Sequence, residues 1–182
     1  GGLLAFYAAA MDSRIHAAVV SGYFQSRQQV WTEPIYRNVW GLLHGFGDAE
    51  IASLICPRRL IIEGGRGPEV SGPPQREGCN QAAPGRLTTP PDDSVRTEFK
   101  RARERFEKLG LADRLILVDA GQQAGPGTDP ALAALLEGLG IDAPLTPAGS
   151  PTQDLRGEYD PKPRLHHHFD QLVDYTQKLL RD

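Results

Sequence analysis

The 182-residue chain has few cysteines, no long apolar run and no block of charge of one sign. Its two cysteines, Cys56 and Cys79, have no metal-binding spacing and form no dense disulfide framework, although a single bridge between them stays open. No apolar run approaches the roughly 20 residues that cross a bilayer, so we expect no membrane span. A formal net charge of −3 without a basic block disfavours nucleic acid as a partner.

The start of the chain also shows no recognisable targeting sequence. Gly1 stands first, and no basic stretch leads from it into an apolar one, so no signal-peptide pattern is present there. The sequence looks as though it begins within a domain, and we expect further chain before Gly1. The compartment, bacterial cytoplasm or exported, therefore stays open.

What the sequence does have is an alternation of helix and strand patterns. Short apolar runs at 15–24, 59–63 and 114–120 are typical of strands buried on both faces. Helical patterns lie between and after them, and the first, at 2–11, is apolar all round, which predicts a buried helix. This order predicts a parallel α/β sheet with helices on both faces. The other expected helices are 48–55 capped by Asp48, one capped by Asp93 or Ser94 and ending near Leu109, 130–139 capped by Asp129, and 166–181.

Glycine and proline separate these elements unevenly. Residues 66–94 are rich in both and show no period, which predicts a long loop or insertion. A second proline-rich stretch begins near residue 140. We therefore expect a domain over 1–140 and a connector with a terminal helix over 141–182, which leads to a second domain in the same protein.

Two segments resemble α/β-hydrolases. Gly1-Gly2 and the helix after them resemble the end of the nucleophile turn, Gly-x-Ser-x-Gly, where small residues let helix and strand approach closely. The stretch Ile51-Ala-Ser-Leu-Ile-Cys-Pro-Arg-Arg-Leu-Ile-Ile-Glu63 resembles the region around the seventh strand in acetyl-xylan-esterase and dienelactone-hydrolase-like proteins. The resemblance covers roughly residues 1–140 and implies a three-layer α/β-hydrolase fold that lacks its N-terminal side.

The resemblance implies acyl transfer by a serine, a histidine and an acid, without a cofactor. The serine and one oxyanion donor would lie before Gly1. In the family the acid follows the seventh strand, but Gly67 stands at that position. Glu69, two positions later, is the candidate acid, and a solvated loop glutamate is the alternative reading.

The histidine is the second departure from the family pattern. The loop after the last strand, 121–128, contains none, and glutamine is no general base at neutral pH. His16 and His44 fit structural roles better than catalytic ones. His166, His167 and His168 point in different directions on a helix, so we expect no metal site there.

Other charged or glycine-rich motifs carry no chemistry of their own. Gly64-Gly65-Arg66-Gly67 lacks the spacing of a nucleotide-binding loop. The basic cluster at 100–105 alternates with glutamates, which indicates a solvated helix face. Two hypotheses remain: a serine esterase acting on small acyl or carbohydrate esters, and a catalytically degenerate hydrolase-like scaffold or binding domain.

Overall fold

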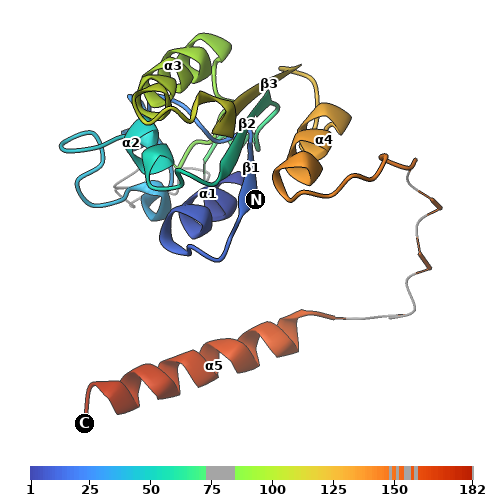
Figure 1. Cartoon of the computed structure of the whole chain (residues 1–182). Coiled ribbons are helices and arrows are strands. Elements are labelled where there is room, and N and C mark those ends of the chain that lie inside the picture. The colour runs from blue at the N-terminus through green and yellow to red at the C-terminus, as the bar shows by residue number, and fades with distance from the viewer. Residues whose placement is uncertain (73–84, 148, 151, 154–156, 158–159, 182) are drawn as a thin grey trace. The chain divides into compact units, whose positions relative to one another are not determined.

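The structure, a computed structural model, describes residues 1–72, 85–147, 149–150, 152–153, 157 and 160–181. They form two units, Gly1–Leu145 and Thr146–Asp182. The first unit contains a parallel three-stranded sheet of β1 (Ala17–Ser21), β2 (Arg59–Gly65) and β3 (Leu115–Gly121), in that spatial order (Figure 1). The predicted α/β class with a parallel sheet is therefore confirmed.

Helices cover both faces of this sheet (Figure 1). The helices α1 (Gly2–Met11), α2 (Asp48–Ser53) and α3 (Asp92–Lys108) form the layer on one face, and α4 (Asp129–Gly138) lies on the other. Side chains alternate along a strand, so neighbouring residues enter different cores. Within β2, Leu60 and Ile62 pack in the larger core, whereas Ile61 packs with α4. Every residue of β2 is buried, as expected for a strand covered on both faces.

The first helix departs from the sequence prediction. Phe6 and Ala9 are buried, but Leu4 is 70% exposed and Met11 is 84% exposed. An apolar helix is buried all round only where packing partners surround it, and in the described part of the chain α1 packs on β1 and α2. The prediction of a fully buried helix is therefore wrong for these residues.

The predicted caps of three helices were also wrong. Helix α3 begins at Asp92 with Pro91 at its N-cap position, so neither Asp93 nor Ser94 caps it. Asp48 is the first residue of α2, and its carboxylate accepts hydrogen bonds from Gln25 N and Arg27 Nε. The free N–H of Ala49 instead donates to Glu98, which lies on α3. These partners are far away in the sequence, so a local capping rule misses them.

Helix α4 is likewise stabilised from a distance. It begins at Asp129, after Thr128 at its N-cap position. The residues just before the helix are held by Glu63 of β2 rather than by Asp129, because the Glu63 carboxylate accepts hydrogen bonds from Gly127 N and Thr128 N. Three short helices lie in other connections: η1 (Val30–Thr32) and η2 (Ile35–Arg37) between β1 and α2, and η3 (Ala112–Arg114) between α3 and β3.

The glycine- and proline-rich segment 66–94 is described in part. Val70 pairs with Leu87 in an antiparallel bridge, and residues 73–84 lie outside the described residues. Cys79 is among those, so the structure does not test its bridge to Cys56.

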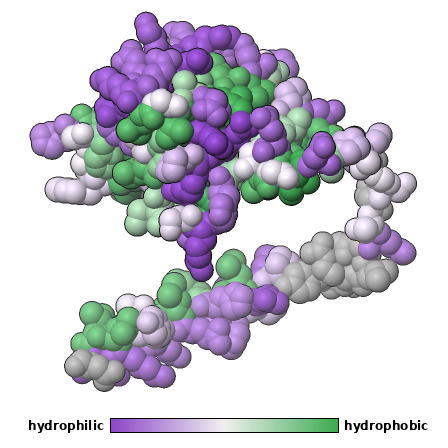
Figure 2. Space-filling view, viewed as in Figure 1, coloured by the Kyte–Doolittle hydropathy of each residue, from purple (hydrophilic) through white to green (hydrophobic). Residues whose placement is uncertain are grey.

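The described residues of the second unit include the helix α5 (Lys162–Leu179), which begins earlier than predicted. All of its described residues are exposed, including its apolar side chains. Figure 2 shows apolar and polar groups side by side along it. No described helix is long and apolar enough to cross a membrane.

Candidate active site

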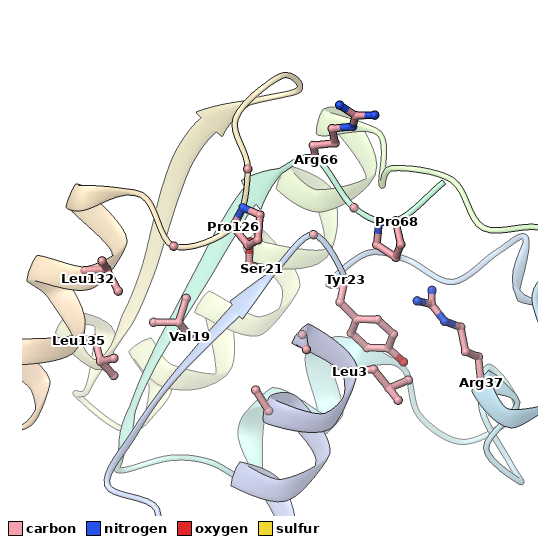
Figure 3. Close-up of a pocket in the computed structure, with 17 residues that line it drawn as sticks. Leu3, Val19, Ser21, Tyr23, Arg37, Arg66, Pro68, Pro126, Leu132 and Leu135 are labelled. Carbon is pink, nitrogen blue, oxygen red and sulfur yellow. The ribbon is translucent and has the colours of Figure 1, made fainter. Parts of the chain in front are cut away.

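A pocket of about 720 Å³ opens at the carboxyl edge of the sheet (Figure 3). The N-terminus of α1 lies on one side of it, and the loops after β1, β2 and β3 meet there. This is the edge where open α/β sheets bind ligands. The lining residues are Gly1, Gly2, Leu3, Ala5, Val19, Ser21, Gly22, Tyr23, Arg37, Arg66, Gly67, Pro68, Gly125, Pro126, Gly127, Leu132 and Leu135.

Glycine is required where α1 meets β1. A Cβ atom on Gly2 would lie 2.9 Å from the Cβ of Tyr23 and closer still to the carbonyl oxygen of Ser21. A Cβ atom on Gly1 would meet nothing within 4 Å. The start of α1 is therefore pressed against the end of β1 at residue 2, and only a residue without a side chain fits there.

The loops after β1 and β2 also cross closely. A Cβ atom on Gly67 would lie 2.7 Å from the carbonyl oxygen of Gly22, which itself has a φ of +58°. Gly67 N donates to Thr89 Oγ1 at 3.2 Å. This crossing places Gly67 and Pro68 in the pocket wall.

A buried ionic network supports one wall of the pocket. The guanidinium of Arg27 donates to Asp48 at 3.0 Å and to Glu33 at 3.4 Å, and it lies 3.5 Å from the centroid of the Tyr23 ring. Glu33 also accepts from Arg37 at 3.0 Å. Tyr23 and Arg37 thus reach the pocket from a network that fixes both of them.

Burial dominates the acid–base behaviour of this network. It raises the pKa of Asp48 to about 6, although the charge of Arg27 and a backbone hydrogen bond from Gln25 act in the opposite direction. Burial also raises the pKa of Tyr23, so its hydroxyl stays protonated. The network is therefore built around a carboxyl group whose pKa is raised by burial.

Glu63 is a second buried carboxylate, at the end of β2. It is 2% exposed and accepts from Gly127 N at 2.9 Å, Thr128 N at 2.8 Å and Thr128 Oγ1 at 2.7 Å. Burial alone would raise its pKa, but the hydrogen bonds from Gly127 and Thr128 help to outweigh burial and hold the pKa below its usual range. An ionised Glu63 therefore fixes the loop that follows β3.

The sequence-predicted residues are only partly brought together. Gly1 and Gly2 line the pocket, as do Gly67 and Pro68. Glu69 is exposed and does not line it; its carboxylate accepts from Thr89 Oγ1 at 2.8 Å.

The histidines lie elsewhere. His16 is exposed just before β1, at the amino end of the strand, and His44 lines a separate hollow beside α2 and α3. His166, His167 and His168 are exposed on α5. Within the described residues, no group of three His, Cys, Asp or Glu side chains is placed to hold a metal ion.

Two residues of this site escaped the sequence analysis. Arg37 lies in the aromatic-rich stretch 25–47, which has no periodic pattern that would place it. Glu63 could have been found, because an acid at the carboxyl end of a parallel strand lies at the ligand-binding edge of the sheet. Its ionised state depends on donors from the loop before α4.

The chain matches no protein-family model and no curated protein. Among solved structures, it is similar to a carbohydrate esterase family 15 glucuronoyl esterase from Caldicellulosiruptor kristjansonii, with 20% identity and a TM-score of 0.46. The likeness covers 75% of this chain and 39% of that one, so the chain spans well under half of the esterase's length. A likeness of this size assigns neither a family nor an activity.

Proposed function

We propose that this chain forms the C-terminal part of an α/β-hydrolase domain in a serine esterase that acts on small acyl or carbohydrate esters. The observation that carries the proposal is the packing of Gly2 against Ser21 at the carboxyl edge of the sheet. The nucleophile turn of α/β-hydrolases requires small residues at such a strand–turn–helix junction.

The direction of the chain supports the same reading. Helix α1 starts at the carboxyl edge, packs on β1, and leads through residues 12–16 into the amino end of that strand. A strand entering Gly1 would then lie parallel to β1, with α1 as the right-handed crossover helix. In this arrangement the serine side chain projects into the pocket two positions before Gly1.

The chemistry would be acyl transfer. The serine oxygen attacks the ester carbonyl while a histidine accepts its proton, and the same histidine then protonates the departing alcohol. Water releases the acid from the acyl-enzyme. The residue between the serine and Gly1 donates its backbone N–H to the oxyanion, beside the positive end of α1.

Glu69 remains our candidate for the acid that orients the histidine. Gly67 and Pro68, which precede it, already line the pocket. The Glu69 carboxylate would have to leave Thr89 Oγ1 and turn inward. The histidine would come from chain outside residues 121–128.

One observation favours a second candidate function, a catalytically degenerate scaffold or binding domain beside a further domain. The loop that carries the histidine in the family is attached to Glu63 through Gly127 and Thr128. This loop has no histidine, and three hydrogen bonds already occupy the carboxylate. In such a protein the pocket would bind a ligand without turnover.

The two candidates differ in a direct assay. We would measure the hydrolysis of p-nitrophenyl acetate by the 182-residue chain and by the longer protein that also includes the residues encoded before Gly1. The esterase proposal expects Gly-x-Ser-x before Gly1, hydrolysis by the longer protein only, and loss of activity when that serine becomes alanine. Another small residue in place of the serine, or no hydrolysis by the longer protein, favours the scaffold.

A further inference from the structure

Arg37 brings a positive charge to the pocket wall. Its side chain extends from the end of η2 toward Tyr23 and Pro68 (Figure 3). The side chain is 11% exposed, and its guanidinium carbon lies 5.3 Å from the centroid of the Tyr23 ring. Nη1 donates to Glu33, whereas Nε is buried and has no hydrogen-bond partner among the described residues. Arg37 is therefore held in place with donor capacity left over.

The charges around the pocket are unbalanced. Arg37 and Arg66 are its charged lining side chains, and no described lining residue is acidic. Glu33 neutralises the charge of Arg37 only in part, because the same carboxylate also accepts a hydrogen bond from Arg27. Arg66 is exposed and points away from the other labelled side chains in Figure 3. It therefore adds positive electrostatic potential only at the rim of the pocket.

The start of α1 adds positive potential from the other side. This helix has no side-chain cap and no acidic residue in its first turn. Its free N–H groups and macrodipole favour negative charge nearby. Near Arg37 and the start of α1 the wall carries Leu3 and Tyr23, and the apolar lining continues away from Arg37 with Val19, Leu132 and Leu135 (Figure 3). The pocket thus matches a ligand with a negative group attached to a short apolar body.

We propose that Arg37 binds a carboxylate of the substrate, so that the esters accepted by this pocket carry a free carboxylate beside a short apolar chain. The proposal rests on the proposed function only in taking the ligand to be an ester. Arg37 would hold the ligand carboxylate through one or two charge-assisted hydrogen bonds. The ester end of the ligand would then lie toward the N-terminus of α1.

The test is a binding titration of the 182-residue chain with two matched ligands. Monomethyl glutarate has one ester and one carboxylate, whereas dimethyl glutarate is neutral and nearly the same shape. Backbone amide shifts of Gly2, Gly67 and Gly127 would report binding in the pocket. We expect saturable shifts with the monoester and at least about tenfold weaker binding of the diester, as the loss of one charge-assisted hydrogen bond implies.

Variants then assign the effect to Arg37. Arg37→Gln should weaken binding of the monoester about tenfold, whereas Arg37→Lys, which keeps the charge, should retain most of it. The control is Arg103→Gln, because Arg103 is half exposed on α3 and forms a surface ion pair with Glu107. The remaining amide spectrum and the melting temperature show whether each variant is folded.

Three outcomes would overturn the proposal: equal binding of monoester and diester, equal binding by Arg37→Gln and Arg103→Gln, and tighter binding of inorganic phosphate than of the monoester. The first comparison needs no variant, so it decides even if Arg37→Gln unfolds. The titration involves no turnover. A failure of the esterase assay therefore leaves this result standing, and the reverse also holds.

Discussion

The Glu63 carboxylate accepts a hydrogen bond from Thr128 N at 2.8 Å, which joins the carboxyl end of β2 to the start of α4. A carboxylate at a helix N-terminus satisfies free N–H groups and interacts favourably with the helix dipole. In the described residues, α4 is the helix that covers this face of the sheet. The hydrogen bond therefore connects β2 to the helix that forms the smaller core with Ile61.

Glu63→Gln should lower the free energy of unfolding by about 1–3 kcal/mol at pH 7, because it replaces charged hydrogen bonds by neutral ones in a buried position. Urea denaturation measures the change. Glu107→Gln is the control, since Glu107 is a half-exposed member of a surface pair on α3 and should change stability by less than about 0.5 kcal/mol. Equal effects of the two substitutions would refute the role of Glu63.

The same carboxylate predicts a loss of stability in acid. Its folded pKa lies below that of the unfolded chain, so its contribution is complete above the unfolded value of about 4.3 and is lost as the pH falls through the lower folded value. Urea titrations at pH 5 and pH 3 should therefore show a smaller decline for Glu63→Gln than for the unmodified chain. Parallel declines in both proteins would contradict this prediction.

Asp48 predicts the opposite trend at higher pH. Burial raises its folded pKa to about 6, above the unfolded value of about 3.9. A raised folded pKa contributes stability that is complete below the unfolded pKa and is lost as the pH rises through the folded one. We expect this carboxyl to add about 1 kcal/mol to the free energy of unfolding between pH 7 and pH 5. Asp48→Asn should remove that slope, and an unchanged slope would exclude Asp48 as its source.

Gly2 and Gly1 form a matched pair for testing the α1–β1 junction. Gly2→Ala places a methyl group against Tyr23 and the Ser21 carbonyl and should cost about 1–3 kcal/mol through overpacking. Gly1→Ala meets open space and should be nearly neutral. Thermal and urea unfolding of both variants measure the difference. A tolerated Gly2→Ala would show that the close approach is not required.

The sequence predicted the elements of this fold well because their signals are local. The apolar runs around Val19, Ile61 and Ile116 become three parallel strands, as predicted. The caps of α2 and α4 were wrong because the partners are remote: Glu98 lies 49 residues from Ala49, and Glu63 lies 65 residues from Thr128. Periodicity carries no information about such pairs.

The pocket was harder to predict for the same reason. Its lining comes from the start of α1, from β1 and α4 and from several irregular loops, so no single segment shows its shape or charge. The diglycine was informative because a close backbone approach restricts the residue type at position 2. Arg37 had no comparable signal, since its position depends on Glu33 and Tyr23 in three dimensions.

The last prediction concerns the catalytic acid. If Glu69 orients the histidine, Glu69→Ala in the longer protein should lower kcat for p-nitrophenyl acetate by about 10²–10⁴-fold, the range for loss of a general acid–base partner, with little change in KM. Thr89→Val is the informative partner variant, because it removes the hydroxyl that now holds Glu69. Because the same hydroxyl also accepts from Gly67 N, the melting temperature of this variant is measured as well; with the fold intact, kcat should be unchanged or higher if Glu69 must turn inward to act. Full activity of Glu69→Ala in a folded protein would exclude Glu69 and leave the acid to another carboxylate.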